Sequence, residues 1–116
     1  MLMLKCFFEN KGQASLRHAV VDCLVLDGKK ILLIKRTGKL LEGGKWALSG
    51  GFVERDETTK EAAVREVLEE TGYEIKNLKL LTIRDNPDRP AEDRQNIAFV
   101  YFGTVGKKIQ ESDWEV

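Results

Sequence analysis

The order of its elements predicts that this chain folds as a mixed α/β or α+β domain. Ala19 to Leu26 is a continuous apolar run, broken only by Asp22, which is typical of a buried strand. A segment with helix signals follows near the middle of the chain. Two further apolar segments, at residues 78–83 and 97–102, then indicate strands. One helix between two groups of strands is the pattern of a mixed domain.

The strands before the helix are predicted from turn residues as well as from apolar runs. Leu4 to Phe8 is short and apolar, so it predicts a first strand. Asp27-Gly28 is a hairpin signal, and Ile31 to Ile34 is then the returning strand. Residues 37–45 are polar and contain glycine, which indicates a loop. The adjacent pair Gly50-Gly51 marks a sharp turn or a place where the backbone closely approaches another group.

The central helix has recognisable ends. Thr58 and Glu61 have the spacing of a capping box, in which each side chain accepts a hydrogen bond from the other residue's backbone. Residues 62–70 are rich in helix formers, and Gly72 is a suitable C-terminal stop. Residues 85–94 hold both prolines and many charges, so they predict a loop between the last two strands.

Composition narrows the functional classes. A chain of 116 residues is the size of one domain, here residues 1–116. Its 19 basic and 19 acidic residues balance, whereas a general nucleic-acid binder usually carries a basic surplus. The sequence has no apolar run long enough to cross a bilayer and no cleavage signal at its start, which favours a cytoplasmic protein. Cys6 and Cys23 lie in apolar stretches and are interpreted as buried, reduced thiols.

Three carboxylates share one side of the predicted helix. At about 100° per residue, Glu66, Glu69 and Glu70 fall within an arc of roughly 100°. Val64, Val67 and Leu68 lie opposite and are expected to face the core. Like charges at this spacing repel, and a hard divalent cation such as Mg²⁺ would reverse the sign of that interaction. From these residues alone, a solvated acidic face remains the more common alternative.

The residues around the helix complete a longer pattern. It consists of Gly51, five residues, Glu57, seven residues, and then the run from Arg65 to Tyr73, which reads REVLEETGY. This pattern resembles the complete Nudix box, and the chain is similar to Nudix hydrolases from about His18 to Phe102. The resemblance implies a Nudix-type α/β/α sandwich with a mixed sheet.

The sequence departs from the family pattern in three places. Tyr73 stands where a bulky aliphatic residue is more usual, and Ser49 stands where many members have proline. We expect Ser49 to change loop rigidity and not chemistry. The chain stops at Val116, before the helix that usually closes the sheet, so the C-terminal helix is expected to be missing or short.

The resemblance also implies roles for individual residues. Glu66, Glu69 and Glu70 would bind Mg²⁺, with Mn²⁺ as a substitute, helped by a backbone carbonyl near Gly50 or Gly51. Glu57 and Arg65 would form a supporting ion pair. Glu66 is the candidate general base, and Glu92, Glu111 and Glu115 remain alternatives because some members use a glutamate from a later loop.

The substrate implied by the resemblance is a nucleotide-like small molecule. Residues 85–90 resemble the proline-containing loop of ADP-ribose pyrophosphatases, which favours ADP-ribose or a similar compound. A nucleoside triphosphate is the main alternative, and a Nudix-like domain that binds a nucleotide without cutting it is another. Arg36, Arg84 and Arg89 are candidate substrate contacts. Trp46 is expected in the core, with stacking on a base as the alternative. Neither a nucleic-acid nor a membrane partner is expected, and a homodimer is a further expectation.

Overall fold

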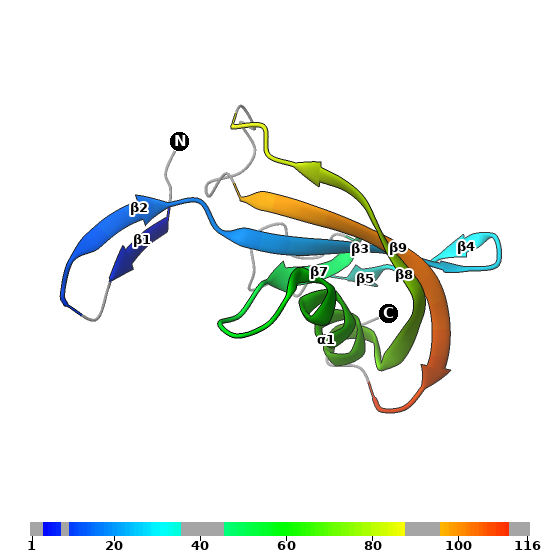
Figure 1. The fold of residues 1–116 in the computed structure, drawn as a ribbon. Coiled ribbons are helices and arrows are strands. Elements are labelled where there is room, and N and C mark those ends of the chain that lie inside the picture. The colour runs from blue at the N-terminus through cyan, green and yellow to red at the C-terminus, as the bar shows by residue number, and fades with distance from the viewer. Residues whose placement is uncertain (1–3, 8–9, 36–45, 88–95, 112–116) are drawn as a thin grey trace.

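The computed structural model describes residues 4–7, 10–35, 46–87 and 96–111, and Figure 1 shows their arrangement. These residues form one helix and nine strands. In chain order the elements are β1 (Leu4–Phe7), β2 (Gln13–Leu16), β3 (Ala19–Asp27), β4 (Lys30–Ile31), β5 (Ile34–Lys35), β6 (Trp46–Ala47), β7 (Ser49–Phe52), α1 (Thr59–Thr71), β8 (Tyr73–Arg84) and β9 (Ile97–Lys108).

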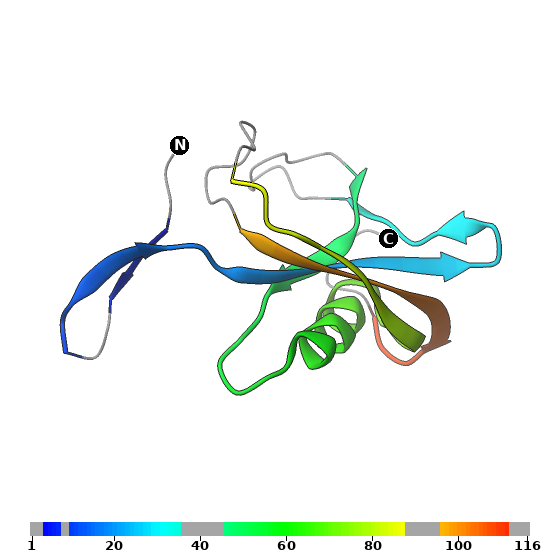
Figure 2. The ribbon, with the colours of Figure 1, turned by 45° about the horizontal axis from the view of Figure 1, so that its top comes forward.

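The main sheet has five strands and mixed directions. Its strand order is β4-β3-β9-β8, and β7 pairs with β3 on the same side as β4. β3 and β9 are parallel, in register from Ala19 opposite Ile97 to Leu26 opposite Thr104. The other pairs in the sheet are antiparallel. Two small ladders, β1–β2 and β5–β6, lie outside this sheet, and the β1–β2 hairpin projects from the body of the domain (Figures 1 and 2).

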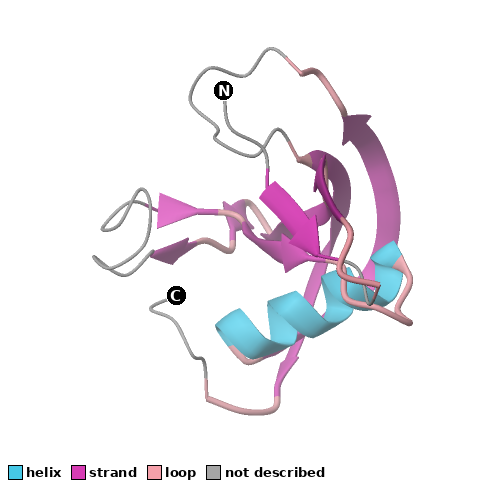
Figure 3. Ribbon diagram, turned by 90° about the vertical axis from the view of Figure 1, so that its left-hand side faces the viewer, coloured by secondary structure: helices cyan, strands magenta, loops and turns pink. Residues whose placement is uncertain are grey.

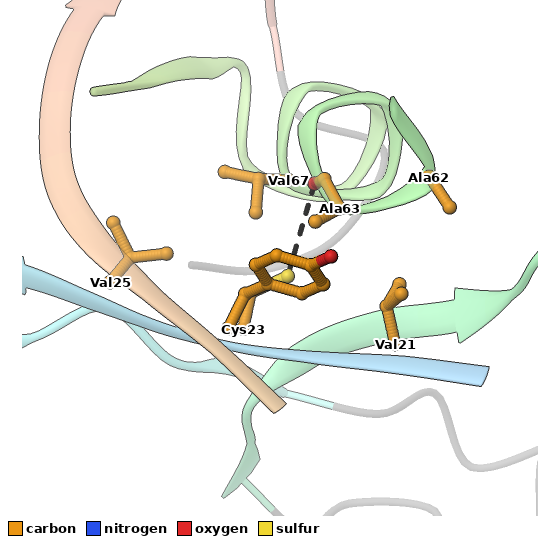
Figure 4. Close-up of a cluster of buried hydrophobic side chains, with 7 residues drawn as sticks. Val21, Cys23, Val25, Ala62, Ala63 and Val67 are labelled. Carbon is orange, nitrogen blue, oxygen red and sulfur yellow. Dashed lines mark hydrogen bonds between the residues drawn. The ribbon is translucent and has the colours of Figure 1, made fainter. Parts of the chain in front are cut away.

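The core lies between the sheet and α1, which packs on one face of it (Figure 3). Val21, Cys23 and Val25 alternate along β3 and point toward α1, as the two-residue period of a strand requires. Opposite them lie the small side chains of Ala62 and Ala63, together with Val67 (Figure 4). Tyr101, which is beside Cys23 on the neighbouring strand β9, belongs to the same cluster. Alanines in the contact face allow the helix to pack close to the strands.

Cys23 is a reduced, buried thiol, as predicted. Its Sγ donates a weak hydrogen bond to the carbonyl oxygen of Ala63 at 3.9 Å. Burial raises its pKa to about 12, so the thiol stays protonated and unreactive at neutral pH. The side chain of Cys6 lies outside the described part of the chain.

The helix begins and ends where the sequence predicts. The Thr58 hydroxyl accepts from the Glu61 amide at 3.1 Å, and the Glu61 carboxylate accepts from the Thr58 amide at 2.9 Å. At the other end, Gly72 has a φ of 81° and its amide donates to the Leu68 carbonyl. Both caps satisfy backbone groups that a helix end leaves without partners.

Several predicted boundaries differ from the observed ones. β8 begins at Tyr73, five residues before the predicted start, and β9 continues to Lys108. The predicted strand at residues 31–34 is divided between β4 and β5. Of the two alternatives for Gly50-Gly51, the sharp turn is not observed, because both glycines pair with β3 in extended conformation as part of β7. The predicted loop at residues 37–45 lies outside the described residues.

The mixed α+β class is confirmed, and one detail of the helix is corrected. Within the described ranges α1 is the one helix, so a second helical layer is not seen there. Val64, expected in the core, is 42% exposed, and the buried face is formed by Ala62, Ala63, Val67, Glu70 and Thr71. In that same part of the chain, no helix is long and apolar enough to cross a membrane.

Two glycines with positive φ allow a matched test of the helix terminus. A Cβ at Gly72 would collide with the carbonyl oxygen of Gln110, whereas a Cβ at Gly28, with a φ of 61°, would meet nothing within 4 Å. Gly28→Ala should therefore lower the free energy of unfolding by about 1–2 kcal/mol, which is the strain of a left-handed conformation alone. Gly72→Ala should cost about 1–3 kcal/mol more, because the backbone after β9 must move. Urea denaturation of both variants measures the difference, and equal losses would contradict this packing.

Candidate active site

Arg65 is the centre of the charged cluster on α1. Its guanidinium binds Glu57 through two hydrogen bonds, from Nε to Oε2 at 3.0 Å and from Nη2 to Oε1 at 2.7 Å. Nη2 also donates to the carbonyl oxygen of Phe52 at 3.0 Å. A paired guanidinium–carboxylate contact of this kind fixes orientation as well as charge. Arg65 therefore ties the loop between β7 and α1 to the helix, as the predicted ion pair requires.

The remaining nitrogen of the same guanidinium faces three further carboxylates. Nη1 donates to Glu66 at 2.8 Å and to Glu69 at 3.3 Å, and it lies 3.6 Å from Glu54. One positive charge thus serves four acidic side chains, including Glu57. The local charge on this side of the helix is strongly negative.

Glu70 is held by β7 and not by a cation. Its Oε1 accepts from the Gly50 amide at 2.8 Å and from the Ser49 hydroxyl at 3.0 Å, and the residue is only 6% exposed. The hydroxyl of Ser49 also reaches the Glu66 carbonyl oxygen at 3.4 Å. The side chain of Glu70 therefore lies between α1 and β7, where solvent cannot stabilise its charge.

The glycine pair allows β7 to pack closely on both of its neighbours: Gly51 faces α1 and Gly50 faces β3. A Cβ at Gly51 would lie 2.6 Å from a carboxylate oxygen of Glu66, and one at Gly50 would collide with the backbone of Val21. A side chain at Gly50 would push β7 away from β3, whereas one at Gly51 would displace the Glu66 carboxylate. Close approach is the alternative that the structure bears out for this pair.

The pKa values of the carboxylates in the cluster are shifted in different directions. Burial raises the pKa of Glu70 to about 7, even though it accepts hydrogen bonds from Gly50 and Ser49. Burial also raises the pKa of Glu66, and the Arg65 contact only partly offsets this. The hydrogen bonds from Arg65 lower the pKa of Glu57. Negative charge is thus stabilised at Glu57 and is costly at Glu66 and Glu70.

The chemistry of these donors fits a hard divalent cation, although no preformed cage is present. Among the described residues, no three acidic, histidine or cysteine side chains converge on one point. Glu69 and Glu66 are directed to Arg65, and Glu70 to β7. The fit lies in the charge: the mostly covered Glu66 and the buried Glu70 have raised pKa values and lie beside the backbone of two glycines. Oxygen ligands of this type suit Mg²⁺ or Mn²⁺.

The alternative of a solvated acidic face does not describe Glu70. Glu69 is half exposed, Glu66 is mostly covered and Glu70 is buried. The cause is β7, which packs over the acidic side of α1. The helix thus buries both its apolar face and part of its charged face.

Other candidate residues are not brought to the cluster or lie outside the described residues. Arg84 on β8 is opposite Ala98 on β9, and Ala98 is opposite Val20 on β3. Val20 is opposite Phe52 on β7, so two strands lie between Arg84 and β7. At about 4.8 Å per strand, Arg84 is roughly 14 Å from β7. Glu111 lies at the C-terminal end of α1, where its backbone contacts Gly72. The candidates outside the described residues are Arg36, Arg89, Glu92 and Glu115.

The sequence analysis did not predict two polar contacts, and it predicted the wrong environment for one residue. Ser49 was expected to affect only loop rigidity, yet its hydroxyl binds Glu70. The available signal was a hydrogen-bond donor where many Nudix proteins have proline, which has no side-chain donor. Glu54 joins the Arg65 cluster from the loop before α1. Trp46 was expected in the core but is half exposed, with Lys35 Nζ 5.9 Å from its ring centre.

Comparisons with known proteins show the family of this chain. A family profile described as the NUDIX domain matches residues 16–116. The chain is 40% identical over 95 residues to an ADP-ribose pyrophosphatase of Methanocaldococcus jannaschii, covering 80% of this chain and 54% of the relative. It is 42% identical over 55 residues to a CTP pyrophosphohydrolase of Escherichia coli, covering 47% and 41%. This chain thus spans about half the length of these relatives.

The fold is also similar to that of a solved structure. It is a bifunctional NMN adenylyltransferase/ADP ribose pyrophosphatase from Francisella tularensis, complexed with AMP and a manganese ion. Its sequence identity to this chain is 26% and the TM-score is 0.64, with 85% of this chain and 34% of that one covered.

The geometry around Arg65 predicts that lysine cannot replace it. Lysine keeps the charge but not the planar pair of donors that binds Glu57. We expect Arg65→Lys to lower the free energy of unfolding by about 1.5–3 kcal/mol, the range for lost hydrogen bonds to charged groups. Arg55→Lys is the matched control, because Arg55 pairs with Asp56 at the exposed surface. Denaturant titration that finds the two variants equally stable would refute a structural role for the paired contact.

The raised pKa of Glu70 predicts a pH-dependent gain in stability for Glu70→Gln. Above pH 7 the folded, metal-free protein carries a buried charge that glutamine lacks, while the glutamine oxygen still accepts from Gly50 and Ser49. The sign follows from a folded pKa of about 7 against an ordinary 4.5: Glu70 costs stability as pH rises through this window. In chelator, Glu70→Gln should be more stable than wild type by on the order of 1–3 kcal/mol at pH 8.

At pH 5 the two proteins should be nearly equal, because Glu70 is then protonated in the folded state. Glu69→Gln, at a half-exposed site, is the control and should show no such gain. A Glu70→Gln difference independent of pH would mean that its charge is not the cause.

Proposed function

This chain belongs to the Nudix family, and we propose that it hydrolyses a diphosphate linkage in a nucleoside diphosphate derivative with the help of a bound divalent cation. The observation that carries the proposal is the cluster on α1. Glu66 and Glu70 are two covered carboxylates with raised pKa values, and the single guanidinium of Arg65 does not neutralise them. Such a site gains most from a ligand that brings positive charge.

Each residue of the cluster has a role in this proposal. Glu66, Glu69 and Glu70 hold Mg²⁺ or Mn²⁺ together with the backbone of Gly51. When bound, the cation acidifies a water molecule and neutralises phosphate oxygens, which are the standard contributions of a metal to such reactions. Arg65 and Glu57 position the helix against β7. Glu66 accepts the proton of the attacking water, the water oxygen bonds to phosphorus, and the anhydride P–O bond breaks.

The preferred substrate class is ADP-ribose or a similar nucleotide derivative. The 40% identity to an ADP-ribose pyrophosphatase supports this class. Trp46 adds support, because an exposed indole three residues before Ser49 lies within about 10 Å of the cluster along an extended chain. That separation suits a base stacked on the indole while its phosphates reach the acidic residues. The similarity to a CTP pyrophosphohydrolase favours a nucleoside triphosphate as the second candidate.

The direct test is a hydrolysis panel with separated products. ADP-ribose with Mg²⁺ should give AMP and ribose 5-phosphate with higher kcat/KM than any common nucleoside triphosphate. Chelation should abolish the reaction, and Mn²⁺ should restore it. Glu69→Gln should lower kcat by at least about a hundredfold, as removal of a charge-stabilising group does.

Glu61→Gln is the control for the same helix, because glutamine also completes a capping box. It should leave kcat within about twofold of wild type. A triphosphate with the higher kcat/KM would move the chain to the second candidate. Nucleotide binding without turnover of any compound would identify a sensor and refute hydrolysis.

A further inference from the structure

Ser49 is a buried polar residue on the side of β7 that packs against α1. It is opposite Cys23 in the pairing of β3 with β7, and directly opposite residues in a sheet point to the same face. Cys23 belongs to the core beneath α1, so the Ser49 side chain also points toward the helix. Ser49 is 0% exposed. A hydroxyl cut off from water costs free energy unless it has a hydrogen-bond partner, so the contacts of Ser49 indicate its role.

The spacing along β7 matches the spacing of two carboxylates along α1. Ser49 and Gly51 are two residues apart on one face of the strand, a distance of about 6.6 Å. Glu66 and Glu70 are four residues apart on the helix, a rise of about 6.0 Å. Ser49 therefore meets Glu70 where Gly51 meets Glu66. Position 51 supplies space for a carboxylate, and position 49 supplies a hydrogen-bond donor.

Two donors from β7 bind the same oxygen of Glu70. The Ser49 hydroxyl donates to Oε1 at 3.0 Å, and the Gly50 amide donates to this atom at 2.8 Å. Two donors restrict where the oxygen can lie, and the preference of a donor for the plane of the carboxylate restricts how the group can rotate. These donors leave Oε2 for another partner, and the carboxylate of Glu70 also contacts that of Glu66.

The Ser49 hydroxyl has one proton and two acceptors within reach. The acceptors are Oε1 of Glu70 at 3.0 Å and the carbonyl oxygen of Glu66 at 3.4 Å. The shorter contact is to a carboxylate, and a hydrogen bond to an ionised acceptor is about twice as strong as one between neutral groups. Ser49 is therefore bound more closely to the side chain of Glu70 than to the backbone of the helix.

We propose that Ser49 is a positioning residue for the cation site, and that it acts by holding Oε1 of Glu70 while leaving Oε2 for the cation. This inference rests on the proposed function, in which Glu66, Glu69 and Glu70 hold a divalent cation. A ligand oriented before the cation arrives loses less freedom on binding. Loss of such a supporting hydrogen bond typically lowers metal affinity by ten- to a hundredfold, on the order of the effect expected here.

Manganese binding to the substrate-free protein tests the proposal. Free Mn²⁺ is measured by electron paramagnetic resonance during a titration. Ser49→Ala removes the hydroxyl without adding volume and should weaken Mn²⁺ binding at least about tenfold. Tyr101→Phe is the matched control, because it removes a hydroxyl that joins the sheet to Thr59 at the start of α1. This contact is about 16 Å along the helix from Glu70. Tyr101→Phe should therefore bind Mn²⁺ as the wild type does.

The titration separates the role of Ser49 from the presence of the cation site. Equal Mn²⁺ affinity of the wild type and Ser49→Ala would overturn the role of Ser49 and leave the site intact. Equal weakening by Ser49→Ala and Tyr101→Phe would show a general loosening of α1 and would also overturn it. A wild type that binds no Mn²⁺ would overturn the cation site, and the role of Ser49 with it.

The metal dependence of hydrolysis gives a second measurement. Ser49→Ala should raise the Mn²⁺ concentration for half-maximal activity about tenfold, because it weakens the hold on one ligand. At saturating Mn²⁺ its kcat should stay within about threefold of wild type, because the ligand itself remains. A lower kcat with an unchanged half-maximal concentration would contradict a role in positioning the cation ligand.

Discussion

The close approach of β7 to the acidic side of α1 is the constraint on which the site depends. Gly51 leaves no side chain between the strand and the Glu66 carboxylate, and the Gly50 amide donates directly to Glu70. The same contact removes water from Glu70 and raises its pKa to about 7. Packing and electrostatics are therefore opposed here: the strand can approach only by burying charge that it does not neutralise.

Arg65 determines how that charge is divided. Its paired contact with Glu57 lowers the pKa of that carboxylate and anchors the loop before the helix. Its other hydrogen bonds go to Glu66, Glu69 and the carbonyl oxygen of Phe52, and it makes no hydrogen bond to Glu70. The result is a rigid cluster with surplus negative charge. Sites of this kind trade stability for function, and the proposed cation would recover the stability when bound.

The sequence was sufficient for features that depend on local geometry. The capping box at Thr58 and the stop at Gly72 depend on spacing along one helix, and both were predicted from the residues. The Glu57–Arg65 pair was predicted only from the resemblance to the Nudix box. Features set by tertiary contact were not predicted. The exposure of Val64 and the burial of Glu70 both follow from where β7 packs, and helical periodicity does not contain that information.

The missed role of Ser49 has the same origin. A hydroxyl beside a glycine pair does not reveal which carboxylate it will bind until the strand and helix are brought together. The early start of β8 is similar: residues 73–77 are partly polar, and pairing with the end of β9 makes them a strand. In both cases hydrogen bonds between elements distant in the sequence determine the structure, and the local sequence has only a weak conformational preference.

The central claim is that the charge buried between β7 and α1 is a binding site for a divalent cation. The most direct measurement is the free energy of unfolding in chelator and in saturating Mn²⁺, for wild type and for Glu70→Gln. A ligand that binds only the folded state must stabilise it. The account predicts that Mn²⁺ stabilises the wild type clearly and the Glu70→Gln variant far less. Equal stabilisation of both proteins, or none of either, would contradict it.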